Sequence, residues 1–300
     1  MICYKCKKEI CPKDKPFSGL HPSCFLDWFG LANVREFNDV IARESESNLG
    51  PFNDINSSFF HGKFRKYSAH LAGVSYLLKV KQDDFPELPH CEYVCNQIAQ
   101  LLGLNIPAFY LIRFMGNLDT FVSRNFMQDF SNASLVHMYH FLEEKDEFDC
   151  ETLKKIIENK TQRIKDIECF IEITLFDSLI GNHDRHGRNL GLIQTPDGFH
   201  LSPVYDNPSY IGIEINDLLG AIHEPRGKII TQKTSEPKLQ DYVEEWKRLG
   251  HQDLVEKWLS KVFHLQNKLL DIINSSFMSE KRKEALLKLL NRRLEEVSND

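Results

Sequence analysis

The chain has 300 residues, a hydrophobic content of 42% and a net charge of −6 at pH 7. This length fits one large domain or two lobes, and the acidic balance argues against direct nucleic-acid binding through bulk charge. No apolar stretch reaches the roughly 18 residues of a membrane span, and MICYKCKKEI has no apolar core like that of a secretory signal. We expect a cytoplasmic protein that does not bind membranes, with delivery into another cell kept as an alternative.

Residues 1–30 form a short head that is rich in cysteine. Without a secretory signal its thiols are expected to be reduced. The candidate metal ligands are a C-x2-C pair and an H-x2-C pair: Cys3, Cys6, His21 and Cys24. Three thiolates and an imidazole form a tetrahedral zinc set with no open position, so the predicted site is structural. Reduced cysteines without a metal are the alternative, and Cys11 is the spare.

Residues 31–128 are expected to form a lobe that is rich in strands. The segment begins with helical character, becomes turn-rich in SNLGPFNDINSS, and has strand patterns from 57 to 81. Alternation in GVSYLLKVK places four apolar side chains on one face: Val74, Tyr76, Leu78 and Val80. HCEYVCNQIAQLLGL then predicts a helix, and IPAFYLIRF and LDTFVSRNFM predict two strands joined by a turn at MGN.

Residues 129–300 are expected to form a helical lobe. DIECFIEITLFDSLIG is apolar nearly all round, which is typical of a buried helix. The polar loop GNHDRHGRN follows, and then two short strands, LGLI and FHLSPVYD, joined by a turn at TPDG. From residue 236 the chain predicts amphipathic helices, and the basic face of the last one is expected to be solvated. The predicted fold class is α+β with two lobes.

The polar loop contains residues suited to phosphoryl transfer. Asp184 and Asn189 have D-x4-N spacing, and Asp206 follows in SPVYDN after the expected hairpin. Phosphoryl transfer needs a carboxylate to orient or deprotonate the attacking hydroxyl, and oxygen ligands that hold Mg²⁺ on the nucleotide phosphates. Asp184 meets the first need, and Asn189 and Asp206 meet the second. The alternative is a polar turn whose side chains cap helices.

Two histidines and two arginines in the same loop have less specific predictions. His183 and His186 could chelate zinc, but no third ligand stands nearby at metalloprotease spacing. We therefore expect His186 to structure the loop. Arg185 and Arg188 remain open between contact with a substrate or phosphate and pairing with an acidic neighbour.

A kinase-type site also needs a strand lysine to hold the α- and β-phosphates. Lys79 in YLLKV fits that role, and Lys81 on the same face is the backup. The following helix offers Glu92 as the acidic partner of the lysine, and Glu87 is a weaker candidate.

The segment INSSFFHGKFRKY stands where a phosphate-binding loop is expected, although it contains neither G-x-G-x-x-G nor G-x4-G-K-[ST]. Its candidate phosphate contacts are Ser57, Ser58, Gly62 and Lys63. An ordinary turn is the alternative for the two serines.

Together these segments resemble the HipA-like serine/threonine protein kinases. The motifs that carry the resemblance are GNHDRHGRN, SPVYDN, EYVCNQIAQLLGLNIP after the strand lysine, and TFVSRNF. The similarity spans nearly the whole chain and is greatest to the short HipT-like members, whose cysteine-rich heads the first 30 residues also resemble.

This resemblance implies a two-lobed kinase-like fold, with Asp184 as catalytic base and Lys79 in the ATP site. It also places Phe126 and Met127, at the end of TFVSRNFM, among the ATP-binding residues, and gives Glu92, His186 and Arg188 supporting roles. It implies autophosphorylation of the serine loop at Ser58, or alternatively at Ser57. FFHG departs from the family pattern there, so the detailed nucleotide contacts stay open.

The family's biology implies partners as well. Members act as toxins of toxin–antitoxin systems and phosphorylate aminoacyl-tRNA synthetases. Their partners are a DNA-binding HipB-like antitoxin and, for the short forms, a small HipS-like inhibitor. Two other classes remain as alternatives: a phosphoinositide-type lipid kinase, since those enzymes share a D-R-H-x-x-N loop, and a kinase-fold binding module without chemistry.

Overall fold

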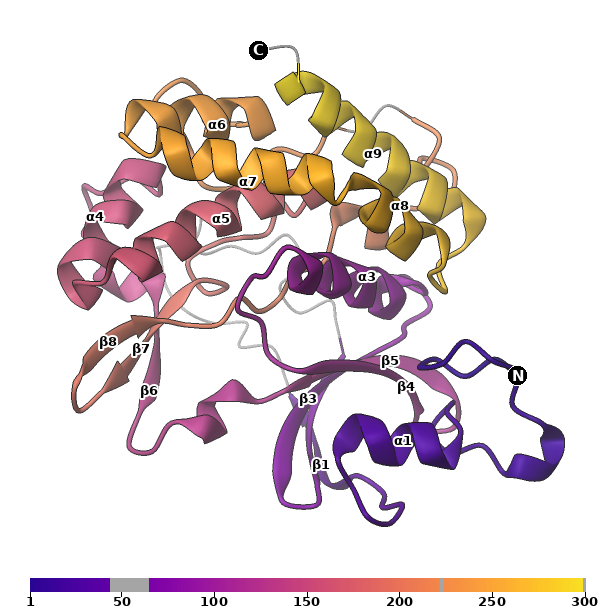
Figure 1. Ribbon diagram of the computed structural model, residues 1–300. Coiled ribbons are helices and arrows are strands. Elements are labelled where there is room, and N and C mark those ends of the chain that lie inside the picture. The colour runs from indigo at the N-terminus through magenta and orange to yellow at the C-terminus, as the bar shows by residue number, and fades with distance from the viewer. Residues whose placement is uncertain (44–64, 222–223, 299–300) are drawn as a thin grey trace.

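The computed structural model describes residues 1–43, 65–221 and 224–298 (Figure 1). A sheet-rich lobe and a helical lobe lie one above the other, and helix α3 (Leu88–Leu101) lies between them. The mixed α+β architecture with two lobes and a cysteine-rich head agrees with the predicted fold class. Among the described residues, no helix is both long and apolar enough to cross a membrane.

In the described residues the N-terminal lobe is built on a five-stranded antiparallel sheet of order β1-β2-β3-β5-β4. Its strands are β1 (Asn38–Arg43), β2 (Lys66–Leu71), β3 (Val74–Val80), β4 (Phe109–Phe114) and β5 (Leu118–Arg124). The predicted hairpin around MGN is confirmed, because β4 and β5 pair from Phe114↔Leu118 onward.

Alternation along β3 gives the sheet two different faces. Tyr76 and Leu78 are buried in one hydrophobic cluster with residues of the head, including Phe25 of α1 (Pro22–Phe29). This burial confirms the predicted apolar face, since successive side chains of a strand point to opposite sides. Lys79, which follows Leu78 directly, therefore points to the other face. The head shares the core of this lobe.

The helical lobe contains α4 (Cys150–Thr161), α5 (Ile164–Ile180), α6 (Leu239–Arg248), α7 (Gln252–His264), α8 (Gln266–Asn274) and α9 (Glu280–Ser298). Helix α5 contacts α4, α6 and α9, and most of its side chains are buried. That burial confirms the predicted core helix. A second sheet at the side of the lobe joins β6 (Ser134–His137), β7 (Gly191–Thr195) and β8 (Gly198–Leu201) (Figure 1).

Two expectations from the sequence were wrong. Residues 31–37 are not helical and lead into strand β1, because the segment continues the aromatic packing of the head, with Phe37 against Phe29 and Tyr76. Residues 133–181 were expected to be mainly helical, but residues 134–137 form strand β6, because they pair with β7. The amphipathic segment LVEKWLSKVFHLQNKLLDII is helical as predicted, and it divides at Leu265 into α7 and α8.

The basic face of α9 is also not simply solvated. Arg282 and Arg293 are buried, with exposed fractions of 2% and 0%. Arg282 pairs with Glu87 at 3.2 Å, and Arg293 donates to the Pro225 carbonyl at 2.7 Å. These arginines hold neighbouring segments against the last helix, which a helical wheel alone does not reveal.

Candidate active site

Four charged side chains meet between the two lobes. The ammonium of Lys79 on β3 contacts Glu92 Oε1 of α3 at 2.5 Å and also contacts Asp206 Oδ1. Lys66 on β2, the cross-strand partner of Lys79, lies 3.4 Å from Asp206 Oδ2. Two lysines side by side on a sheet would repel each other. Here the Asp206 carboxylate lies between them and compensates both charges.

Burial and these ion pairs have opposite effects on the pKa values of Lys79 and Asp206. Burial disfavours the charged ammonium of Lys79, but the Asp206 and Glu92 carboxylates outweigh it and raise the pKa of Lys79 above its usual range. Burial similarly opposes ionisation of Asp206, yet Lys66 and Lys79 lower the pKa of Asp206 well below its usual range. For Glu92, burial dominates and raises its pKa. Asp206 is therefore the firmly ionised carboxylate of the set.

The polar loop begins where α5 stops abruptly. Gly181 ends the helix in a left-handed conformation with φ of 72°. A side chain there would also lie 2.6 Å from Leu289 Cδ2 and 2.8 Å from Pro225 Cγ, so only glycine fits. The Asn182 side chain then accepts a hydrogen bond from the Asp184 backbone N–H at 3.0 Å. These contacts place Asp184 immediately beyond the end of a rigid buried helix.

Arg185 ties the loop to the segment that carries Asp206. Its guanidinium makes a two-pronged contact with Asp177 of α5, at 2.7 and 2.9 Å. It also donates to the Asn189 carbonyl at 2.9 Å, the Tyr205 carbonyl at 2.6 Å and the Asn207 side chain at 2.7 Å. Of the two roles left open, pairing with an acidic neighbour is the one observed. An arginine with its donors used in this way cannot also grip a substrate.

His186 is buried and His183 is partly buried, and both are neutral near pH 7. Burial lowers the pKa of each to about 4. His186 accepts from the Arg188 N–H through Nδ1 at 3.0 Å, and its carbonyl accepts from the Asn189 N–H at 2.9 Å. His186 thus structures the loop as expected. Among the described residues, neither His183 nor His186 belongs to a group that could hold a metal.

The remaining candidates of this lobe cluster around the same loop. The Asn189 amide nitrogen donates to the Asp184 carbonyl at 2.9 Å, which fixes the orientation of the amide. Asp206 has φ of 58°, a left-handed conformation that Asp adopts more readily than most residues. Arg188 lies with its guanidinium 5.8 Å from the Tyr139 ring centroid, and its carbonyl accepts from the Tyr205 hydroxyl at 2.9 Å.

The connection between the lobes also borders the site. Phe126 opens the short 3-10 helix η2 (Phe126–Asp129), and its ring lies 5.7 Å from that of Tyr205, next to Asp206. Met127 lies in the same turn, with its N–H donated to the Asn125 side chain at 3.1 Å. Phe126 and Met127, which the resemblance places in the ATP site, therefore lie where the chain passes from β5 to the helical lobe.

The other lysine and glutamate candidates lie elsewhere. Glu87 pairs with Arg282, while its second oxygen accepts from the Ser279 N–H at 2.6 Å. Lys81 follows β3 and donates its N–H to the Asp119 carbonyl at 2.8 Å. The loop candidates Ser57, Ser58, Gly62 and Lys63 lie outside the described residues.

Three contributors were missed by the sequence analysis. Lys66 had no motif around it, and only the register of β2 against β3 reveals it. Asn207 donates to Asn96 at 3.1 Å, and Asn96 donates to the Glu92 carbonyl at 2.8 Å, so this chain links the two lobes behind the ion pairs. The position of Asn207 directly after Asp206 in SPVYDN was the only available signal.

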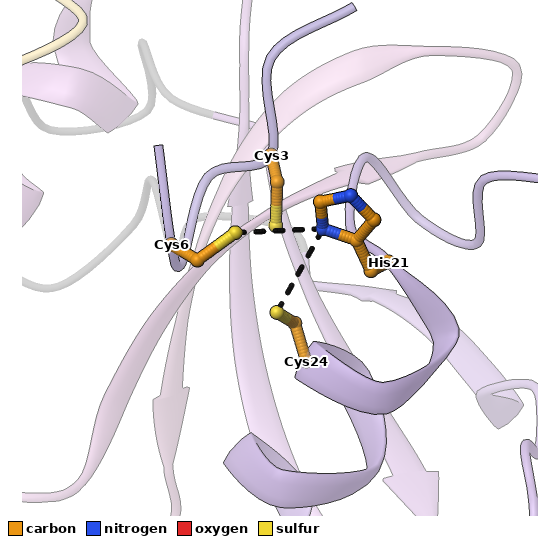
Figure 2. A group of neighbouring side chains, drawn as sticks. All are labelled: Cys3, Cys6, His21 and Cys24. Atoms are coloured by element: carbon orange, nitrogen blue, oxygen red, sulfur yellow. Dashed lines mark hydrogen bonds between the residues drawn. The ribbon is translucent and has the colours of Figure 1, made fainter. Parts of the chain in front are cut away.

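The predicted ligands of the head are also brought together. The side chains of Cys3, Cys6, His21 and Cys24 point toward one another, and their ligand atoms all lie within 4.8 Å (Figure 2). All eight cysteines lie in the described residues, and none forms a disulfide.

The fold and the buried ion pairs define a two-lobed, kinase-like protein. A family model, the HipA-like C-terminal domain, matches residues 53–273. Because this match covers most of the chain, the protein belongs to the HipA-like family. The head precedes the matched region.

Solved structures share the fold at low sequence identity. The Helicobacter pylori proinflammatory kinase CtkA is 20% identical with a TM-score of 0.65, covering 88% of this chain and 93% of CtkA. HipA of Shewanella oneidensis, solved with HipB and operator DNA, is 14% identical with a TM-score of 0.57, covering 87% of this chain and 72% of HipA. No curated protein matches the chain.

Proposed function

We propose that the protein is an ATP- and Mg²⁺-dependent serine/threonine protein kinase. The observation that carries this proposal is the set Lys79, Glu92 and Asp206, which the fold assembles from β3, α3 and the segment after β8. A buried lysine held between two carboxylates is the arrangement that positions nucleotide phosphates in kinases. The polar loop beside it supplies a carboxylate and an amide in addition.

In this proposal Lys79 contacts the α- and β-phosphates, and Glu92 keeps the ammonium in position. Lys66 adds a second positive charge on the same side of the sheet. Asp206 and Asn189 would hold Mg²⁺, which prefers carboxylate and amide oxygens and would neutralise charge on the phosphates. The firm ionisation of Asp206 fits a hard cation, because a protonated carboxyl would not bind one.

Asp184 is the proposed base. The hydroxyl oxygen of a substrate Ser or Thr attacks the γ-phosphorus, and the bond from that phosphorus to the β–γ bridging oxygen breaks, releasing ADP. The hydroxyl proton passes to the Asp184 carboxylate. Arg185 does not touch the reactants; it holds the loop and the Asp206 segment in register through its contacts with both. His186 fills the space beside Asp184, 3.9 Å from Oδ1.

The cellular role follows the family resemblance. We propose a HipT-like toxin of a toxin–antitoxin system that acts in the cytoplasm on a translation component such as an aminoacyl-tRNA synthetase. The structure of HipA with HipB and operator DNA supports a HipB-like antitoxin as partner, and a small HipS-like inhibitor is a further proposed partner.

The activity is tested by incubating the protein with γ-labelled ATP and Mg²⁺, alone and with a cell extract. Label in a protein band from wild type, absent with Asp184→Asn, supports the proposal. Lys145→Gln is the matched control, because it changes an exposed charged side chain of the same lobe outside the site and should retain transfer. Label confined to lipid would indicate a lipid kinase, and ATP binding without transfer would indicate a binding module.

The autophosphorylation site is tested separately by mass spectrometry of the purified protein after incubation with ATP. Phosphate on Ser58 or Ser57 that is absent with Asp184→Asn supports modification by the protein itself. Phosphate on neither serine after complete peptide coverage would remove this part of the proposal.

A further inference from the structure

The head contains a compact group of sulfur and nitrogen atoms that the proposed kinase chemistry does not use. Cys6 Sγ lies 3.4 Å and Cys24 Sγ 3.9 Å from His21 Nδ1 (Figure 2). With Zn–S bonds of about 2.3 Å and Zn–N bonds of about 2.0–2.1 Å, a tetrahedral site has edges of about 3.6 to 3.8 Å. These two distances are thus close to the edges of a coordination shell, and all four ligand atoms lie within 4.8 Å of one another.

The orientation of His21 points to a metal ligand. Its Nε2 lies 3.2 Å from the Glu9 carbonyl. A carbonyl only accepts, so Nε2 carries the hydrogen, and in the neutral ring Nδ1 then presents its lone pair. That lone pair faces the sulfur atoms. A carbonyl that fixes the tautomer of a histidine is a common supporting contact at metal sites.

The local backbone supports the same arrangement. Cys3 and Cys6 lie in a tight loop closed by hydrogen bonds from the Cys3 N–H to the Lys8 carbonyl and from the Lys7 N–H to the Cys3 carbonyl, both 2.9 Å. His21 occupies the N-cap position of α1, and Cys24 lies in the first turn of this helix. A helix N-terminus favours negative charge, so it suits a thiolate ligand.

We propose that Cys3, Cys6, His21 and Cys24 bind one structural Zn²⁺ ion, and that this ion holds the loop of residues 3–8 as a strap between the two lobes. The ion would replace the protons of three thiols, and four protein ligands would leave no open position for catalysis. This inference does not depend on the proposed kinase activity.

Two residues of the strap reach the lobes: Tyr4, between the ligands Cys3 and Cys6, and Lys7, which follows Cys6. Tyr4 is 4% exposed, and its hydroxyl donates to Asp119 on β5 and accepts from Arg113 at 3.2 Å. The Tyr4 ring also packs edge-on against Phe277, between α8 and α9, with centroids 4.8 Å apart. A single side chain held between two zinc ligands therefore touches both lobes.

Lys7 adds a second contact with the helical lobe. Its ammonium donates to Ser275 Oγ, just after α8, at 2.7 Å. Without a metal, hydrogen bonds, the packing of Tyr4 and one ion pair, Lys5 with Asp27 of α1, hold the loop in this position. A metal would add bonds from Cys3 and Cys6 of the loop to the ligands at the start of α1, which is anchored in the core of the sheet-rich lobe. Zinc would thereby limit the movement of one lobe against the other.

The metal is tested on the full chain, purified under reducing conditions, by elemental analysis for zinc and iron. We expect one zinc per chain in wild type and in Cys11→Ser, the matched control whose exposed thiol lies outside the group. Cys6→Ser should lose it. Because this variant could unfold, zinc release from wild type is also followed with a chromogenic chelator after thiol modification. Absence of metal, a Cys3–Cys6 disulfide or stoichiometric iron would overturn the zinc assignment.

The strap is tested by hydrogen exchange measured by mass spectrometry. Stripping zinc from wild type should accelerate exchange by roughly tenfold or more in the peptide covering residues 275–279, while α4 stays unchanged. Tyr4→Phe should keep the zinc but accelerate exchange in the same peptide and around Asp119. Unchanged exchange in residues 275–279 after zinc removal would overturn the strap, whatever the metal content.

Discussion

The candidate active site and the head each gather several polar groups, but they balance those groups in different ways. Both gather polar groups in a partly buried place. The active site joins residues from Lys66 to Asp206, drawn from both lobes, and its charges compensate one another. The head draws its group from residues 3–24, and its three thiols and one imidazole contain no opposite charges.

The active site contains its own balancing charges, whereas the head does not. Ion pairs between oppositely charged residues keep the active site organised before any ligand binds. If all three thiols of the head were ionised they would repel one another, and a bound cation would offset that repulsion. We therefore expect the active site to keep its shape without nucleotide, and the head to loosen without metal.

The largest expected effect is on catalysis. Asp184→Asn keeps the size of the side chain but removes the proposed base, so phosphoryl transfer should fall by about 10²- to 10⁴-fold. ATP affinity and the melting temperature should change little, because the ion pairs around Lys79 remain. Initial rates and nucleotide titration check this. Full activity in the variant would contradict the assigned role.

The compensation itself is tested with Lys79→Met. This change leaves Glu92, with an exposed fraction of 1%, beside Asp206 without its cation, and unfolding free energy should fall by about 3–5 kcal/mol. Adding Glu92→Gln should recover part of that loss, since it removes the stranded charge. Denaturant unfolding of the two single variants and the double variant measures the coupling. Additive losses would show that the pair is not a unit.

Metal removal sharpens the contrast between the regions. A zinc-selective chelator should lower the melting temperature by on the order of 5 °C, since 1 kcal/mol corresponds to about 2–4 °C in chains of 150–250 residues. Cys11→Ser should respond like wild type. Removal of nucleotide and Mg²⁺ should leave hydrogen exchange around Glu92 nearly unchanged. Equal loosening of both regions would contradict the expected difference between them.

The smallest expected effect concerns pH. The pKa of His183 is lowered to about 4 by burial, whereas in the unfolded chain it is about 6.5. Between these values the unfolded state binds the extra proton, so stability should fall as pH decreases from about 6.5 to 4. His183→Gln should flatten this dependence. Melting temperatures of both proteins across that range check the slope, and parallel curves would contradict it.

The sequence predicted those parts of the molecule that have a regular spacing. Alternation revealed the buried face of β3. The spacing of Asp184, Asn189 and Asp206 predicted that they lie around one loop, because the hairpin between Asn189 and Asp206 has nearly fixed geometry. Ligand spacing similarly predicted the group in the head. Each of these signals is local or follows a motif.

What failed depends on packing between distant segments. Lys66 joins Asp206 only through the register of two strands, and Arg185 reaches Asp177 because α5 and the loop lie together. The buried Arg282 looks like a surface residue on a helical wheel. Residues 31–37 gave a helical pattern, but Phe37 packs against the aromatic rings of Phe29 and Tyr76, and the segment is not helical. No single-segment pattern contains these facts.

The charges around Asp206 have a consequence for how a nucleotide would enter. The charges of the two lysines and two carboxylates sum to zero, so the site has no net positive charge to attract phosphate from a distance. A nucleotide phosphate could pair with Lys79 only if it replaced a carboxylate in the ion pair. Asp206, released from the lysine, could then bind a cation. Ligand and metal would therefore enter together as partners in one exchange, and long-range attraction would contribute little.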